Sequence, residues 1–186
     1  TGSDNAVLGA AALYANTTGN YNTALGRSAL LSNTTANYST AVGYQAGYDN
    51  TTGVIDALGA SALANNTTGN YNTAIGGSSL FDNTTGSNNV AVGRNALENN
   101  TTASNNVAVG YQAAYSNTTG ARLTAIGYGA LYANTTGNDN TAVGWNTLDA
   151  NTTGINNVAM GRDALGVNTS GGYNVALGMN SLASNT

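Results

Sequence analysis

The chain of 186 residues contains no cysteine, no histidine and no proline. The lack of cysteine excludes disulfides and thiolate metal sites, and the lack of histidine removes the commonest general base and metal ligand. Only 6% of residues are charged, the net charge is −4, and four arginines are the only cations. No apolar run approaches the ~18 residues of a membrane span. We therefore expect no cofactor, no bound metal, no nucleic-acid partner and no membrane insertion within this chain.

What the chain has instead is one repeat from end to end. A glycine recurs in steps of 17 residues, with a single step of 16, and we call these residues the coil glycines: Gly9, Gly26, Gly43, Gly59, Gly76, Gly93, Gly110, Gly127, Gly144, Gly161 and Gly178. Around each glycine the unit reads approximately Asn-x-Thr-Ala-Val-Gly-x-x-Ala-Leu-x-x-Asn-Thr-Thr-Gly-x. A fixed period of this length is typical of repeat architectures in which successive copies stack.

The segment before each coil glycine alternates in the manner of a short strand. The residue directly before it forms the aliphatic column, and the residue two before it forms the alanine column, for example Val92 and Ala91. Neighbouring residues of a strand point to opposite faces, so one column faces the coil interior and the other faces out. The sequence leaves open which column is which.

A second apolar patch lies three and four residues after each coil glycine, as in Ala96-Leu97, and its second position defines the leucine column. This patch could start a single helical turn, but Asn, Thr and Gly are too frequent for a helical repeat. We predict an all-β, parallel β-solenoid of eleven coils of about 17 residues, forming one repeat domain over residues 1–186. We expect the domain to be a window of a longer array or a subunit that stacks end to end.

The five-residue segments ending at Gly93, Gly110 and Gly161 resemble the Asn-Ser-Val-Ala-Ile-Gly signature of the head repeats of trimeric autotransporter adhesins, the YadA-like heads. The longer unit also looks like repeat tracts of phage tail fibres and bacterial surface proteins. This resemblance implies a left-handed β-roll, three chains around one axis, and an extracellular location on a cell surface or a virion fibre. The repeat of that family is usually shorter, near fourteen or fifteen residues, so the Asn-Thr-Thr-Gly corner is longer here.

Polar columns accompany the apolar ones. Asn-Thr-Thr and Asn-Thr-Ser runs fit a ladder of turns, because asparagine suits turns and hydrogen-bonds to its equivalents along a stack. They also satisfy the N-glycosylation sequon. The candidate glycosylation sites are Asn16, Asn33, Asn50, Asn66, Asn83, Asn100, Asn117, Asn134, Asn151 and Asn168. A turn ladder is the simpler interpretation, because a sugar on every coil would crowd its neighbours.

The residue after each coil glycine forms the edge column, which is rich in aromatic residues and arginine. Such residues often anchor interfaces and sugars, although they could also only cover coil edges or pack between chains. The candidate contact residues are Arg27, Tyr44, Arg94, Tyr111, Tyr128, Trp145 and Arg162. The main hypothesis is therefore an extracellular structural or adhesive fibre module that associates with itself, as a homotrimer or an end-to-end filament, and contacts a receptor or glycan.

The sequence also bears on two other functions, ice binding and catalysis. Ladders of Thr17-Thr18 and their successors could order water, as in an ice-binding β-solenoid, although adjacent threonines in a strand would point to opposite faces. An enzyme is not expected, because the eight acids are scattered over different columns and no pair has the spacing of an acid and a base.

Overall fold

The computed structural model describes residues 2–184, and its regular elements are short strands separated by turns and bends. The strands are β1 (Ala6–Leu8), β2 (Thr23–Leu25), β3 (Thr40–Val42), β4 (Ile55–Leu58), β5 (Asn72–Ile75), β6 (Val90–Val92), β7 (Val107–Val109), β8 (Thr124–Ile126), β9 (Thr141–Val143), β10 (Val158–Met160) and β11 (Val175–Leu177). None of the described residues forms a helix, so none forms one long and apolar enough to cross a membrane.

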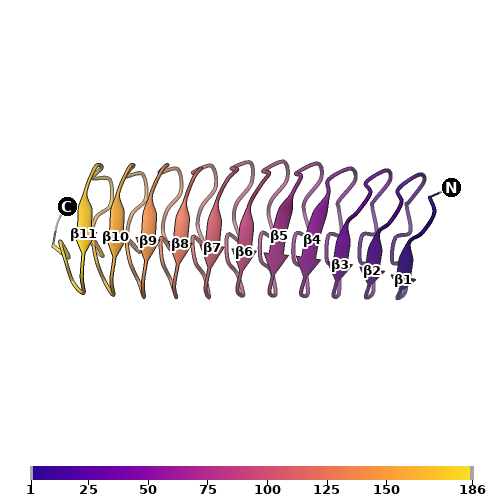
Figure 1. Ribbon diagram of the computed structural model, residues 1–186, viewed down its shortest axis with the longest axis horizontal. Coiled ribbons are helices and arrows are strands. Elements are labelled where there is room, and N and C mark those ends of the chain that lie inside the picture. Colours follow the sequence, from indigo (N-terminus) through magenta and orange to yellow (C-terminus); the bar gives the residue numbers. More distant parts are fainter. Residues whose placement is uncertain (1, 185–186) are drawn as a thin grey trace.

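The strands form one parallel sheet whose spatial order follows the sequence from β1 to β11. The chain is a rod of stacked coils with its two ends at opposite tips (Figure 1). Equivalent residues of successive coils lie in register, so that Ala91 pairs with Ala108 and Val92 pairs with Val109. The predicted parallel β-solenoid, with coils of about 17 residues, is therefore confirmed.

The alanine column points into the coils, and the aliphatic column points out. From Ala24 to Ala159 every alanine of the column is fully buried, whereas Leu58, Ile75, Ile126 and Met160 of the aliphatic column keep 39–44% of their surface exposed. Inside each coil the alanine column lies in the same core as the leucine column. The core of one chain thus contains the alanine column, the leucine column and the alanine that precedes most of these leucines, such as Ala96, whereas the larger aliphatic side chains remain outside it.

The leucine column reaches the core through an unusual backbone conformation. Leu97 and its equivalents have φ near 50°, in the left-handed region that bulky residues rarely adopt. The residue two after the coil glycine and the residue five before it are also left-handed in nearly every coil, for example Asn95 and Asn88. The Ala-Leu patch is therefore a run of tight turns, and the alternative of a helical turn is wrong.

The coil glycines meet a spatial as well as a conformational requirement. Gly76 has a φ of 129°, and a Cβ placed on it would lie 2.7 Å from the carbonyl carbon and oxygen of Gly93 in the next coil. Any side chain here would separate the coils. The strict 17-residue recurrence of glycine follows from this contact.

Two departures from the repeat compensate each other in the core. Gly47 replaces the leucine of its coil, and Ile55 replaces an asparagine in the next coil. A Cβ on Gly47 would lie 2.7 Å from Cδ1 of Ile55, so the isoleucine fills the space that the missing leucine leaves. The same pair of departures recurs at Ala114 and Leu123, and both of those side chains are fully buried in the core.

The single 16-residue step is a deletion at a corner. The Val54 amide donates to Oδ1 of Asn70 at 3.0 Å, as Asn20 does to Asn37, which places Val54 before the missing residue. The residue removed is the left-handed corner residue that Tyr38 and Tyr71 supply in neighbouring coils. Strand register is kept, since Ala41 pairs with Ala57.

Candidate functional surfaces

The outer face of the sheet is a mostly apolar surface that follows the rod from β1 to β11. It carries the aliphatic column and, two residues earlier on each strand, a column of mostly threonine and valine such as Thr73 and Val90. Asp56 in β4 is the only charged residue among the strands β1 to β11. With coils about 4.8 Å apart, the eleven aliphatic side chains make a stripe ~50 Å long. Monomeric proteins rarely expose a continuous apolar stripe of this extent.

The edge column brings most of the predicted contact residues into one continuous row. The rings of Tyr111 and Tyr128 stack with centroids 5.3 Å apart, and Trp145 meets Tyr128 edge-on at 5.6 Å. The Arg162 guanidinium lies 5.6 Å from the centre of the Trp145 ring, within the range of a cation–π contact. All three residues are 41–52% exposed and lie outside the core, so they keep accessible surface beside their contacts with one another.

The remaining predicted contact residues lie on the same edge but away from this row. Arg27 and Tyr44 occupy the edge column of the second and third coils, and both are exposed. Ala60 and Gly77 follow them in the column and separate them from Arg94, where the continuous row of five coils begins.

A second aromatic column runs beside the row, four residues further along each coil. Tyr115 and Tyr132 stack with centroids 5.3 Å apart. In the next coil this column holds Asp149, whose half-buried carboxyl has a raised pKa because burial disfavours its charged form and because Asp163 adds negative charge nearby. The rings of the row therefore have acids as well as arginines for neighbours.

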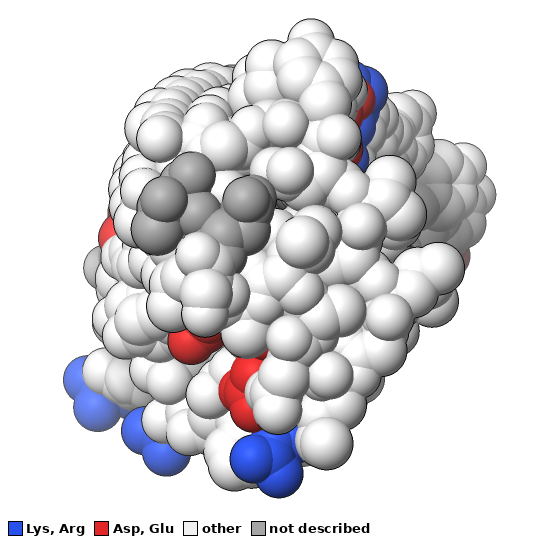
Figure 2. Space-filling view, turned by 90° about the vertical axis from the view of Figure 1, so that its left-hand side faces the viewer, with Lys and Arg blue, Asp and Glu red and all other residues white. Residues whose placement is uncertain are grey.

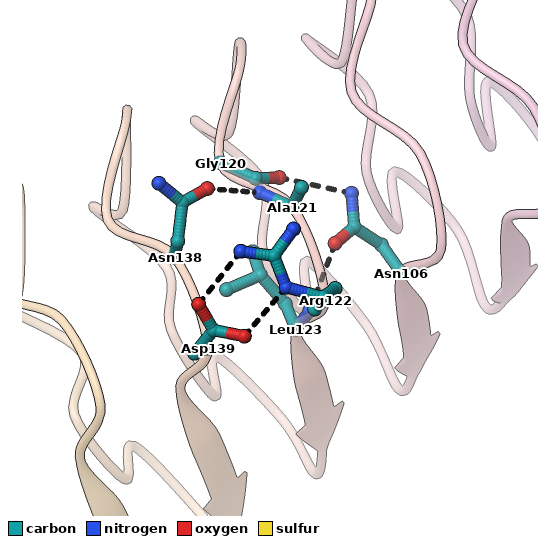
Figure 3. Close-up of polar contacts among 7 residues, drawn as sticks. All are labelled: Asn106, Gly120, Ala121, Arg122, Leu123, Asn138 and Asp139. Carbon is teal, nitrogen blue, oxygen red and sulfur yellow. Dashed lines mark hydrogen bonds and ion pairs between the residues drawn. The ribbon is translucent and has the colours of Figure 1, made fainter.

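Charge is sparse and, apart from Asp56 in β4, lies outside the strands. Figure 2, which looks along the rod from its C-terminal end, shows the cations gathered mainly at one lower corner. At another corner Arg122 of one coil forms a bidentate ion pair with Asp139 of the next, at 2.6 and 2.8 Å (Figure 3). This contact lowers the pKa of Asp139, first through the hydrogen bond from Arg122. Both groups are exposed, and such pairs contribute little to stability.

The asparagines proposed for glycosylation form a buried ladder. From Asn33 to Asn168 each Nδ2 donates to Oδ1 of the equivalent asparagine in the preceding coil, at 2.7–3.4 Å. Nδ2 also donates to the carbonyl three residues later, for example from Asn100 to Ala103. All of them except the half-buried Asn16 are fully buried. Both hydrogens of Nδ2 are thus used inside the rod, and a glycan on this nitrogen would replace one of these buried bonds.

The two threonines that follow each ladder asparagine lie in a bend outside the strands and differ in exposure. The hydroxyl of the first, such as Thr84, donates to the carbonyl of the equivalent threonine in the next coil at 2.8–3.1 Å. The second, such as Thr85, is exposed in every coil. The second threonines thus form one exposed row along the rod. Ice binding through two flat threonine rows stays a prediction.

One aromatic column was missed in the sequence. The left-handed corner residue is tyrosine in several coils, and Tyr21 and Tyr38 stack with centroids 5.2 Å apart. This column could have been predicted from the sequence, because Tyr21 and Tyr38 are separated by the 17-residue repeat period.

Within residues 2–184 there is no pocket and no group of three acids that could hold a metal ion. Comparison with protein-family models, curated proteins and solved structures finds no match to the chain. The architecture defines the class as a β-solenoid repeat protein, and its function has to be argued from its surfaces. The resemblance to adhesin heads stays a prediction.

Proposed function

We propose that this chain is a structural and adhesive module of an extracellular fibre, which associates with copies of itself through the outer face of its sheet. The observation that carries the proposal is the aliphatic column: eleven side chains in register, all apolar, facing away from the core. The core cluster includes none of them and is formed mainly by the alanine column, the leucine column and the alanines that precede those leucines. Their strict aliphatic character is explained if another chain covers them.

The rod geometry favours a load-bearing role over catalysis. Each coil is bonded to the next by strand pairing, by the asparagine ladder and by threonine hydroxyls, so cohesion runs along the whole length. In a stack of this kind each repeat contacts only its neighbours along the rod and is stabilised by those contacts. Three chains around one axis, as the resemblance implies, would bury the aliphatic stripe of each chain.

Charge placed on the outer face is expected to abolish association. In V92E/V109E two carboxylates replace adjacent members of the aliphatic column, and burying an unpaired charge in an apolar interface is strongly unfavourable. We expect the unaltered protein to be a discrete oligomer at micromolar concentration and V92E/V109E to be a monomer. Size-exclusion chromatography with multi-angle light scattering measures the difference.

The matched control is T102E/T119E, which adds the same charge to two exposed bend residues of adjacent coils. It should keep the oligomer, with a circular dichroism spectrum like that of V92E/V109E. A monomeric unaltered protein, or an oligomer that survives both glutamates on the sheet face, would contradict the proposal.

A further inference from the structure

The five-coil row from Arg94 to Arg162 has features that self-association does not explain. It lies in the turns after the coil glycines, outside the strands that carry the aliphatic column. It contains three consecutive exposed rings, and the one tryptophan of the chain is among them. Exposed aromatic rings with polar neighbours are typical of surfaces that bind a partner.

From this row we infer a binding site for a neutral, extended polysaccharide of β-linked hexopyranose units. The inference rests on the proposed function and gives its adhesive part a ligand. Ring centroids at 5.3 and 5.6 Å along consecutive coils repeat at about the length of one sugar in such a chain. A polymer extended along the rod therefore meets one ring of the row at each step, which a compact small molecule or an irregular protein surface does not.

The two orientations of the rings supply two kinds of contact. Tyr111 and Tyr128 stack along the rod and turn their edges to solvent, whereas Trp145 stands at 83° to Tyr128 and so turns its ring plane across that stack. Arg162 lies against the Trp145 ring and is itself held by Asp163 at 2.9 Å. This arrangement fixes the tryptophan at one end of the row as an apolar platform for a sugar face.

The neighbouring column provides hydrogen bonds for hydroxyl groups. Gln112 and Asn146 follow Tyr111 and Trp145 directly, and each carries an amide with both donor and acceptor atoms. Between them Gly129 has no side chain, and a Cβ there would lie 2.5 Å from Oδ1 of Asn146. The Asn146 amide thus extends along the row beside the rings.

The charge around the row selects a neutral ligand. Its two arginines, Arg94 and Arg162, are outnumbered by three acids of the same coils: Asp163 directly follows Arg162, and Glu98 and Asp149 stand in the second aromatic column. The net charge around the row is therefore slightly negative. An acidic polymer or a nucleic acid gains no net electrostatic attraction from it. The absence of a pocket in the described part of the chain fits a ligand that lies along a surface.

The test uses Trp145 as its own reporter, since no other tryptophan contributes to the fluorescence. The full chain is titrated with cellohexaose, and its migration is measured in native gels that contain barley β-glucan, soluble starch or alginate. We expect a saturable change in tryptophan fluorescence and retardation by β-glucan that added salt does not reduce. Starch, which is α-linked, and alginate, which is acidic, should not retard the protein.

Two variants distinguish binding at the row from nonspecific binding elsewhere on the rod. Y111A/Y128A should weaken cellohexaose binding about tenfold or more, the loss expected when two contact rings are truncated. Y21A/Y38A removes a similar stacked pair from another column and should bind as the unaltered protein does. No response to cellohexaose and β-glucan, retardation by alginate alone, or equal weakening by both variants would overturn the inference. Light scattering on the same samples reports oligomer formation, so a negative result here is distinct from failure of the proposed function.

Discussion

Replacing Gly47 by leucine is expected to destabilise the rod by about 2–3 kcal/mol, although leucine occupies this position in most other coils. The backbone is not the obstacle, because those leucines adopt the same left-handed conformation that Gly47 does. The obstacle is Ile55, whose Cδ1 already occupies the space at 2.7 Å from a Cβ on Gly47. The new side chain would overpack a core that the isoleucine has filled.

The converse change, I55N, should cost a similar amount, because it removes a buried apolar side chain and leaves a cavity beside Gly47. The double variant G47L/I55N restores the leucine and asparagine of the regular repeat. We expect it to be more stable than the sum of the single changes implies, by about 2–3 kcal/mol. Denaturant unfolding of the four proteins gives this coupling energy.

A matched control pairs G47L with L123N, which makes the same kind of change five coils away. Sites so far apart without shared contacts should be additive within about 0.5 kcal/mol. Additive behaviour of G47L and I55N as well would show that the two positions do not share one space, and the compensation would be refuted.

Removal of one ladder asparagine is expected to weaken the cohesion between neighbouring coils. In N100A the Oδ1 of Asn83 loses its donor, whereas the carbonyl of Ala103 keeps the bond from Asn89 and Nδ2 of Asn117 keeps the carbonyl of Gly120. A buried polar group left without a partner costs about 1–3 kcal/mol. We therefore expect a loss of about 2–3 kcal/mol in the free energy of unfolding, measured by urea denaturation.

The neighbouring T102A removes a side chain of the same coil that is exposed in its bend, and it should change stability by no more than about 0.5 kcal/mol. If N100A is as mild as T102A, the ladder is not a source of cohesion. The comparison also bears on glycosylation, since a nitrogen essential to the buried ladder is not free to carry a sugar in the folded rod.

The repeat period of the sequence is sufficient to predict most of the fold. A glycine every 17 residues predicted stacked coils, and equal residues at equal positions predicted ladders such as the stacked Tyr111 and Tyr128. The direction in which the columns face was not predictable. Adjacent residues of a strand point to opposite faces of the sheet. Because alanine and valine are both apolar, the sequence does not show which of the two columns faces the core.

Other features escaped because they depend on contacts between coils. The predicted hydrogen bonds between equivalent asparagines are present, as from Asn100 to Asn83, but nothing in their spacing showed that Asn100 would be fully buried. Gly47 and Ile55 stand in different columns, and their relation becomes visible only when the coils are stacked. A signal did exist, since Ala114 and Leu123 repeat the same paired departure.

The most direct test of in-register stacking is a set of distances between spin labels placed on exposed bend threonines. Labels at positions 35 and 119, 35 and 153, and 18 and 153 are separated by five, seven and eight coil steps. With an advance of about 4.8 Å per coil, pulsed electron paramagnetic resonance on protein diluted with unlabelled chain should give narrow distances near ~24, ~34 and ~38 Å. Distances that do not increase in proportion to the number of coils would contradict the stacked solenoid and every surface argued from it.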